Sequence, residues 1–216
     1  MSYGLPDGAI VSIASEYDDT VAMSALSNAA NAIATVPADS GLAANDIVVI
    51  GSGWLKADRR VARLSAVAAA AATLALIDTS DLKRFPAGSG VGTLQKITAW
   101  TQISQITAFE TSGGDQNFAN VEFLDDDEQR QLPTSKSPTS LAITIADDPE
   151  KPHNAILAKA DEDRIPRVIR LDLPSGAVLY YNGFVSFNSS PQLTKGNIMT
   201  VKATVALVSR FTRYTA

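Results

Sequence analysis

The chain has 216 residues, of which 45% are apolar and 19% are charged, and its formal net charge is −5. This composition excludes wholesale disorder, and the acidic balance argues against tight binding of nucleic acid through its phosphates. Cysteine is absent and His153 is the only histidine, which excludes disulfides, thiol catalysis, zinc–thiolate sites and multi-histidine metal sites.

Neither a leader nor a membrane segment is predicted. The first eight residues have no basic region followed by an apolar stretch, so we expect no signal peptide. The longest apolar run, 66–77, is mostly alanine and is shorter than the ~20 residues that a membrane helix needs. We therefore expect no membrane insertion.

The first third of the chain mixes strand-like and helix-like segments. Residues 9–14 alternate weakly between apolar and polar side chains and predict a short strand. Residues 22–34 are rich in alanine, which favours a helix, although Asn and Ser interruptions weaken that prediction. Residues 46–50 predict a strand from their β-branched content, ended by Gly51 and Gly53.

The segment 57–77 has two interpretations. Five consecutive alanines, Ala68–Ala72, favour a helix by propensity. The alternative is a pair of strands, at about 60–66 and 72–77, joined by an alanine turn. The glycine-rich stretch that follows, 85–92, predicts a loop.

Beyond residue 97, alternation of apolar and polar side chains indicates strands more clearly. Strands are predicted at 140–146, 168–173, 178–188 and 198–209. In the last of these, Met199 is among the side chains expected to face inward. Pro174, Ser175 and Gly176 predict a tight hairpin turn, so the strands on either side should be antiparallel. The pattern is typical of a two-layer antiparallel structure with a shared core.

One helix is expected, at about 152–163. The residues before it, 147–152, supply an acidic N-cap, prolines for the first turn and negative charge at the positive end of the helix dipole. Ile156, Leu157 and Ala160 form an apolar stripe that can pack on the sheet.

A long polar segment lies at 125–138. It contains two prolines and four consecutive acids but no core-forming pattern. A structureless loop of this length inside a compact domain usually has a function or is disordered. Adjacent acids point in diverging directions, so we interpret this run as solvated or partner-facing rather than as a cation site. The same interpretation applies to the acids in 16–19 and 161–163.

No catalytic constellation emerges from the motifs. The glycines of 88–92 lack the Lys-Ser/Thr ending of a phosphate loop, and 51–53 is an incomplete nucleophile elbow. His153 is interpreted as an exposed or half-packed residue at the helix start. Trp54 and Trp100 are interpreted as packing residues. We predict no enzyme, no cofactor and no metal site.

A series of landmarks occurs in a characteristic order in the second half. They are Trp100-Thr101-Gln102-Ile103, a strand pair at about 103–124, the acidic loop, the strand 140–146 before the short helix, residues 167–176, residues 180–186 with the pattern aromatic-x-Gly-aromatic-Val-Ser, and residues 195–201. In this order and local sequence, residues 100–209 resemble the tail tube (major tail) protein of long, flexible-tailed bacteriophages.

A second resemblance covers residues 20–97. It is carried by residues 41–48, Ser52-Gly53-Trp54, residues 59–64 and residues 76–81. These look like a separate small β-barrel inserted in some phage proteins. The resemblance favours strands over a helix in 57–77.

The two resemblances imply a mainly β fold. The implied core is an antiparallel β-sandwich or barrel with one short α-helix, plus a small β-barrel in the N-terminal half. Residues 1–19 would be an N-terminal strand or arm of the core, 20–97 the small barrel that decorates the tube, and 98–216 the core itself. That core would include the extended loop 125–138 and the helix 152–163.

The resemblance also implies a structural role in the virion, namely hexameric rings that stack into the tail tube, the conduit for DNA ejection. The acidic loop would contact a neighbouring subunit or ring. Its residues in that role would be Asp125, Asp126, Asp127, Glu128, Gln129, Arg130, Gln131, Leu132, Pro133 and Lys136.

Implied partners are further copies of the chain, a tape measure protein, and tail terminator or tip proteins. DNA would pass through the lumen without specific binding, because a negative lumen repels phosphates. The protein would be located in the phage tail after assembly in the host cytoplasm. The alternative is a baseplate or tail-tip protein that binds a receptor or carbohydrate through the small barrel.

Overall fold

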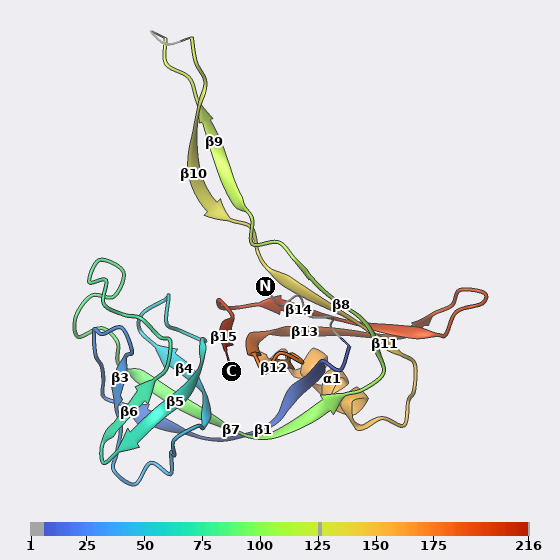
Figure 1. Ribbon diagram of the computed structural model, residues 1–216, viewed down its shortest axis with the longest axis horizontal. Coiled ribbons are helices and arrows are strands. Elements are labelled where there is room, and N and C mark those ends of the chain that lie inside the picture. The colour runs from blue at the N-terminus through green and yellow to red at the C-terminus, as the bar shows by residue number, and fades with distance from the viewer. Residues whose placement is uncertain (1–6, 125–126, 216) are drawn as a thin grey trace.

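The computed structural model describes residues 7–124 and 127–215 and is mainly β-structure with one short helix, as expected (Figure 1). The elements are β1 (Ile10–Met23), β2 (Ala25–Leu26), β3 (Ile33–Thr35), β4 (Ile47–Ser52), β5 (Val61–Ala68), β6 (Ala71–Leu74), β7 (Gly92–Ile103), β8 (Ile106–Ser112), β9 (Gln116–Val121), β10 (Arg130–Lys136), β11 (Ser140–Ala146), α1 (Pro152–Asp163), β12 (Arg167–Asp172), β13 (Val178–Gln192), β14 (Thr200–Leu207) and β15 (Thr212–Tyr214).

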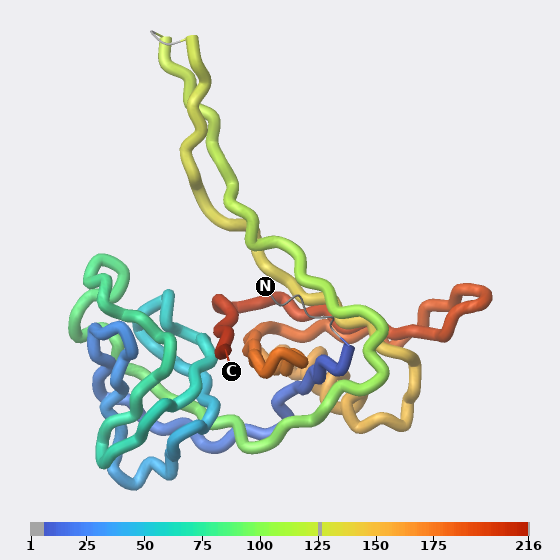
Figure 2. Tube along the Cα trace, in the orientation of Figure 1, coloured from blue at the N-terminus to red at the C-terminus, as the bar shows by residue number. Residues whose placement is uncertain are grey.

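Almost all of these strands belong to one curled antiparallel sheet. Its order is β2-β3-β6-β5-β4-β7-β1-β12-β13-β14-β11-β8, with β15 paired to β13, while β9 and β10 form a separate two-stranded sheet. The long strands β1 and β7 pair with each other along both halves of the molecule. They therefore join a small barrel to a larger half-barrel, which Figure 2 shows side by side.

The small barrel closes because β1 and β2 are one strand interrupted only at Ser24. The end of β1 pairs with β7 on one side, where Met23 lies opposite Gly92. β2 pairs with β3 on the other side, where Ala25 lies opposite Thr35. The order β3-β6-β5-β4-β7 connects these two partners, so no open edge remains along this part of the sheet.

Alanine-rich segments line the interior of this barrel. Ala32, Ala34, Ala62 and Ala72 are fully buried there beside larger side chains such as Leu64. A narrow barrel has room for large side chains at only some inward positions, so alanine is selected for its small volume rather than for helix propensity.

Three expectations for this region have clear outcomes in the structure. The helix favoured at 22–34 is wrong, because the end of β1, β2 and β3 occupy these residues. The two-strand interpretation of 57–77 is confirmed: β5 and β6 form a hairpin in which Ala68 lies opposite Ala71. Trp54 is 2% exposed and its indole N–H donates to the Pro86 carbonyl at 2.8 Å, which confirms its packing role.

The half-barrel has its own hydrophobic core, and the alternating pattern read from the sequence is confirmed there. Ile143, Tyr181 and Val205 point into it from β11, β13 and β14. α1 packs against β13 and β7, with Leu157 and Ala160 fully buried. Met199 is an exception, because it precedes β14 and is 50% exposed rather than inward.

The boundaries of α1 agree with the prediction, but its cap does not. The N-cap residue is Lys151, and no side chain caps the helix. Asp148 instead forms an ion pair with Lys151 at 3.5 Å. His153 is 1% exposed, so the expectation of an exposed or half-packed histidine is wrong. Within the described ranges, no helix has the length and apolar character to cross a bilayer.

A third cluster joins the two halves. Val61 of the small barrel packs there with Val168, Tyr180 and Tyr214 of the larger half. The Tyr214 hydroxyl accepts from the Arg63 amide at 2.8 Å and donates to the Ala75 carbonyl at 3.1 Å. The C-terminal strand β15 thus pairs with β13 while its tyrosine hydrogen-bonds the barrel.

Candidate assembly surfaces

The acidic segment forms part of a hairpin that projects from the body (Figure 1). β9 and β10 are antiparallel, with Arg130 opposite Val121 and Pro133 opposite Phe118. We call residues 113–138 the arm. The expectation of a structureless loop is therefore wrong for 130–136, which is a strand. The strand pair expected at 103–124 is also wrong, because β8 pairs with β11 and β9 pairs with β10.

The base of the arm depends on a glycine pair. Gly113 and Gly114 have φ of 80° and 84°, a region that favours glycine. A Cβ on Gly113 would lie 1.9 Å from the Pro138 carbonyl oxygen. The Ser137 amide then donates to the Asp115 carbonyl at 2.9 Å, which brings the two strands together as they leave the body.

None of the described residues of the arm is buried, so this part of the arm has no core of its own. Every residue of β10 is exposed, and Phe118 and Leu132 are each 56% exposed. Phe123 and Leu124, near its end, are also exposed. A two-stranded hairpin without a packing partner is marginally stable in water, and a set of exposed apolar side chains indicates an interaction surface.

The arm residues named from the sequence fall into two groups. Asp125 and Asp126 lie outside the described residues. The remaining eight, Asp127, Glu128, Gln129, Arg130, Gln131, Leu132, Pro133 and Lys136, are all exposed on the arm. Side-chain bonds between the two sides of the arm include those from Gln129 to Glu122 at 2.6 Å and from Gln131 to Asn120 at 3.2 Å.

The turn at Pro174, Ser175 and Gly176 is confirmed. The Gly176 amide donates to the Leu173 carbonyl at 2.9 Å, and β12 and β13 are antiparallel on either side. All three turn residues are exposed.

A second apolar projection was missed by the sequence interpretation. The connection from β13 to β14 exposes Leu193, Ile198 and Met199 at 73%, 62% and 50%. Figure 1 shows that it leaves the body in a different direction from the arm. The apolar residues Leu193 and Ile198 on either side of Gly196, between the predicted strands 178–188 and 198–209, were the available signal.

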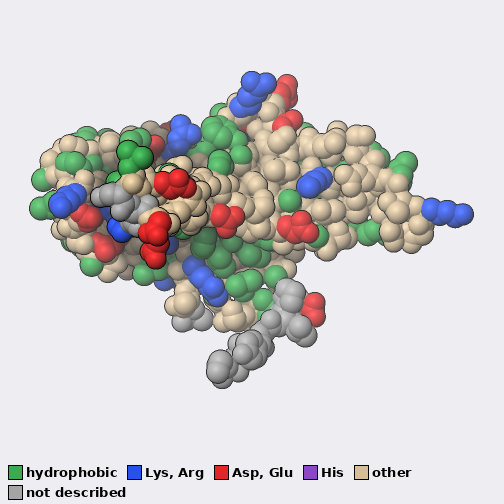
Figure 3. Space-filling model, turned by 90° about the horizontal axis from the view of Figure 1, so that it is seen from above, with side chains coloured by type: hydrophobic (Ala, Val, Ile, Leu, Met, Phe, Trp, Pro, Cys, Tyr) green, Lys and Arg blue, Asp and Glu red, His purple; other side chains and the backbone are tan. Residues whose placement is uncertain are grey.

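The surface seen from the side of the arm is not dominated by one charge. Figure 3 shows acidic, basic and hydrophobic side chains interspersed on it. The acids at 161–163 are not simply solvated, because Asp163 pairs with Arg167 and Asp161 accepts from the Phe187 amide at 3.3 Å.

His153 is the remaining side chain that could in principle take part in acid–base chemistry. Burial lowers the pKa of its imidazole, and its Nδ1 has no hydrogen-bond partner among the described residues. Within those residues there is also no group of three or more acids and histidines that could hold a metal ion.

A family model described as phage tail tube protein matches residues 52–216. The chain belongs to this family. The match begins in the last residue of β4, so it covers the second half of the small barrel as well as the half-barrel. A tail tube protein is a structural component of the phage tail, and membership points to a non-enzymatic role.

Two other comparisons add little. No curated protein matches the chain. Among solved structures, the tube-terminating cap of the anti-feeding prophage is 19% identical, with 50% of this chain and 79% of that chain covered and a TM-score of 0.33. That likeness is too small to bear on function.

Proposed function

We propose that this tail tube protein forms hexameric rings that stack into a tube through which DNA leaves the virion. The observation that carries the proposal is the arm, which exposes apolar side chains on a hairpin without a core. A second exposed apolar projection leaves in another direction. Two unlike surfaces on one chain support head-to-tail contacts, which close into rings when the rotation allows.

Sheet edges support lateral contact between copies. Among the described strands, β8 ends the large sheet and pairs with β11 alone. Beyond Lys96, β7 pairs with β1 alone, because its register with β4 spans only 92–96. Both edges of the half-barrel can therefore pair with a neighbouring copy, which would remove exposed edge strands.

The remaining features of the proposal follow from this assembly. Residues 20–97 form the outward decoration of the tube, although the boundaries 19/20 and 97/98 fall within β1 and β7. The net charge of −5 suits a lumen that repels phosphates. The tube binds the tape measure protein and the terminator or tip proteins, and assembly takes place in the host cytoplasm.

Electron microscopy of the concentrated purified protein tests the proposal. We expect rings with six-fold symmetry that stack into hollow tubes, and native mass spectrometry of short assemblies should give multiples of six. A protein that stays monomeric at all concentrations, or that forms closed dimers only, would contradict the proposal.

A further inference from the structure

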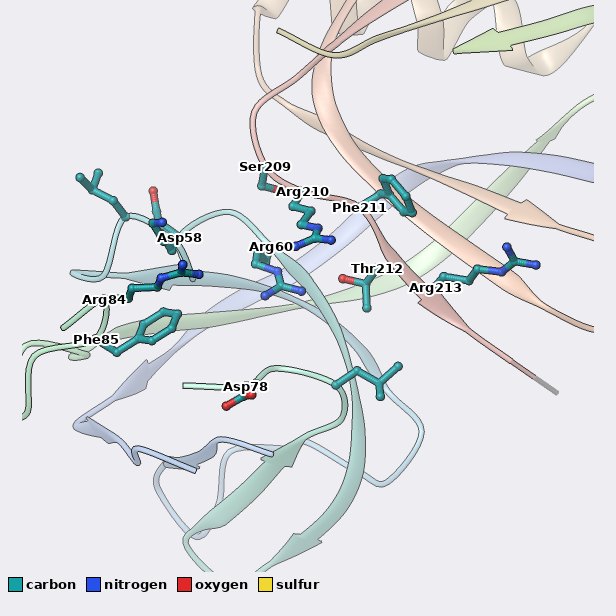
Figure 4. A pocket seen from close by; sticks show the side chains of 13 residues that line it. Asp58, Arg60, Asp78, Arg84, Phe85, Ser209, Arg210, Phe211, Thr212 and Arg213 are labelled. Atoms are coloured by element: carbon teal, nitrogen blue, oxygen red, sulfur yellow. The ribbon is translucent and has the colours of Figure 1, made fainter. Parts of the chain in front are cut away.

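A groove of about 750 Å³ lies between the small barrel and the segment that leads into β15. Figure 4 shows its two walls, with Asp58, Arg60 and Arg84 on one side and Arg210 to Arg213 on the other. Its lining also includes three exposed apolar side chains. These are Leu55 at 94%, Leu76 at 54% and Phe211 at 41%.

The groove carries an excess of positive charge. Its five basic residues are Lys56, Arg60, Arg84, Arg210 and Arg213, against two acids, Asp58 and Asp78. Both acids already accept hydrogen bonds from this chain. The Ser52 amide donates to Asp58 at 3.1 Å, and the amide and hydroxyl of Ser80 donate to Asp78 at 2.9 and 2.7 Å.

Three of these arginines lack an acidic partner in the described part of the chain. Arg84 pairs with Asp81 at 3.2 Å, whereas Arg60, Arg210 and Arg213 form no ion pair there. The Nε atom of Arg60 is buried without a hydrogen-bond partner. Burial, followed by the charge of Arg210, lowers the pKa of Arg60. An anionic group in the groove would accept a hydrogen bond from this Nε and would offset the charge of Arg210.

The end of the arm has the complementary chemistry. Phe123 and Leu124 are 53% and 111% exposed. Four acids follow them in the sequence, of which Asp127 and Glu128 are described and exposed. The end of the arm thus combines apolar side chains with carboxylates, and the groove combines apolar side chains with guanidinium groups.

We propose that the groove binds the end of the arm from a second copy of this chain. The arm leads away from its own body, so it cannot fill its own groove (Figures 1 and 2). Because an extended strand advances about 3.3 Å per residue, the stretch from Gly113 to Leu124 reaches roughly 35–40 Å from its base. That reach is sufficient to contact another subunit. The proposal rests on the proposed self-assembly and names the surface that receives the arm.

Charge reversal with rescue tests this pairing. R210E/R213E and D127K/E128K each place like charges against one another, and we expect each to lower the yield of sedimentable tubes by about tenfold or more. Combining the four substitutions should restore most of the yield. K159E/R164E, in α1 and at its C-cap, changes the net charge by the same amount as R210E/R213E but away from the groove, and it should assemble normally.

The outcomes separate this inference from the proposed function. If R210E/R213E assembles like the original protein, or if the four-fold variant is not rescued, the groove is not the receptor for the arm. Tubes of the original protein would still support the proposed function in either case. If the original protein forms no tubes, the proposed function itself fails.

Crosslinking keeps the inference testable if a charge-reversed variant fails to fold. The chain has no cysteine, so D127C/R213C introduces the only pair. Oxidation of assembled D127C/R213C should give covalent oligomers on a non-reducing gel, whereas D127C/K159C should not. Monomers alone from D127C/R213C would overturn the proposed contact.

Discussion

The small barrel and the arm are both built from short antiparallel strands, yet the barrel buries the side chains of its strands and the arm exposes them. The barrel closes through the continuity of β1 and β2 and buries Ile50, Leu64 and Leu94 completely. The arm leaves both faces of β9 and β10 in solvent. The barrel therefore obtains its stability within one chain, whereas we propose that the arm gains its contacts from another chain. Substitutions in the barrel should therefore change stability, and substitutions in the arm should change assembly.

The largest effect on stability should come from truncating a leucine in the barrel. Leu64 is fully buried, so L64A should lower the free energy of unfolding by about 2–5 kcal/mol. L132A in the exposed arm should change it by less than about 0.5 kcal/mol but should reduce tube yield. Denaturant unfolding and sedimentation measure the two quantities. Equal destabilisation by both variants would contradict the contrast.

The junction of the two halves should be the next most sensitive place. Y214F removes a hydroxyl that bonds the Arg63 amide and the Ala75 carbonyl, which should cost about 1–3 kcal/mol. Y180F is the matched control, because Tyr180 is equally buried and no hydrogen bond of its hydroxyl is found within the described residues. Thermal unfolding of both variants measures the difference. If Y180F costs as much as Y214F, the hydroxyl bonds of Tyr214 do not hold the junction.

A comparable but local effect is expected at the base of the arm. G113A forces a side chain into a positive-φ position against the Pro138 carbonyl, which should cost about 1–3 kcal/mol locally. G41A has a similar φ of 70° but no atom within 4 Å of the added Cβ. We expect G113A to impair tube formation more than G41A. Normal tubes from G113A would show that the direction of the arm is not critical.

The smallest expected effect is a change in the stability of the protein with pH. Burial lowers the pKa of His153 in the folded protein, while the unfolded chain binds a proton near its ordinary value of about 6.5. Asp148 opposes this shift and Lys151 adds to it. The contribution of His153 to the free energy of unfolding should therefore be fully present above pH 6.5 and should be lost as the pH drops below it.

Comparison with H153Q isolates that contribution. The midpoint temperature of the original protein should fall more steeply between pH 7.5 and 5.5 than that of H153Q. Identical slopes would show that His153 takes up its proton equally well in the folded state.

The sequence predicted the half-barrel well because period-two alternation reports which side chains are buried. Leu141, Ile143 and Ile145 lie in the core as that pattern requires. It failed at 22–34, where the volume available inside a narrow barrel outweighs the helix propensity of alanine. It also failed at His153, because the burial of a polar residue depends on what packs over it rather than on its neighbours in sequence.

The assembly surfaces were predictable only in part. Four consecutive acids beside prolines marked the arm as unusual, but the pairing of β10 with β9 was not visible without a hydrophobic alternation. The basic groove could not be predicted, because it joins Arg60 to Arg210 and Arg213 across about two thirds of the chain. Only the fold brings these arginines together.

We propose that the arm joins one copy of the chain to another and adds nothing to the stability of the fold. Replacing residues 116–136 by an Asn-Gly turn tests this directly, because the backbones of Asp115 and Ser137 already meet at 2.9 Å. We expect a variant that unfolds at the same temperature as the original protein and forms no tubes in electron micrographs. Tubes of normal length from this variant would contradict the account.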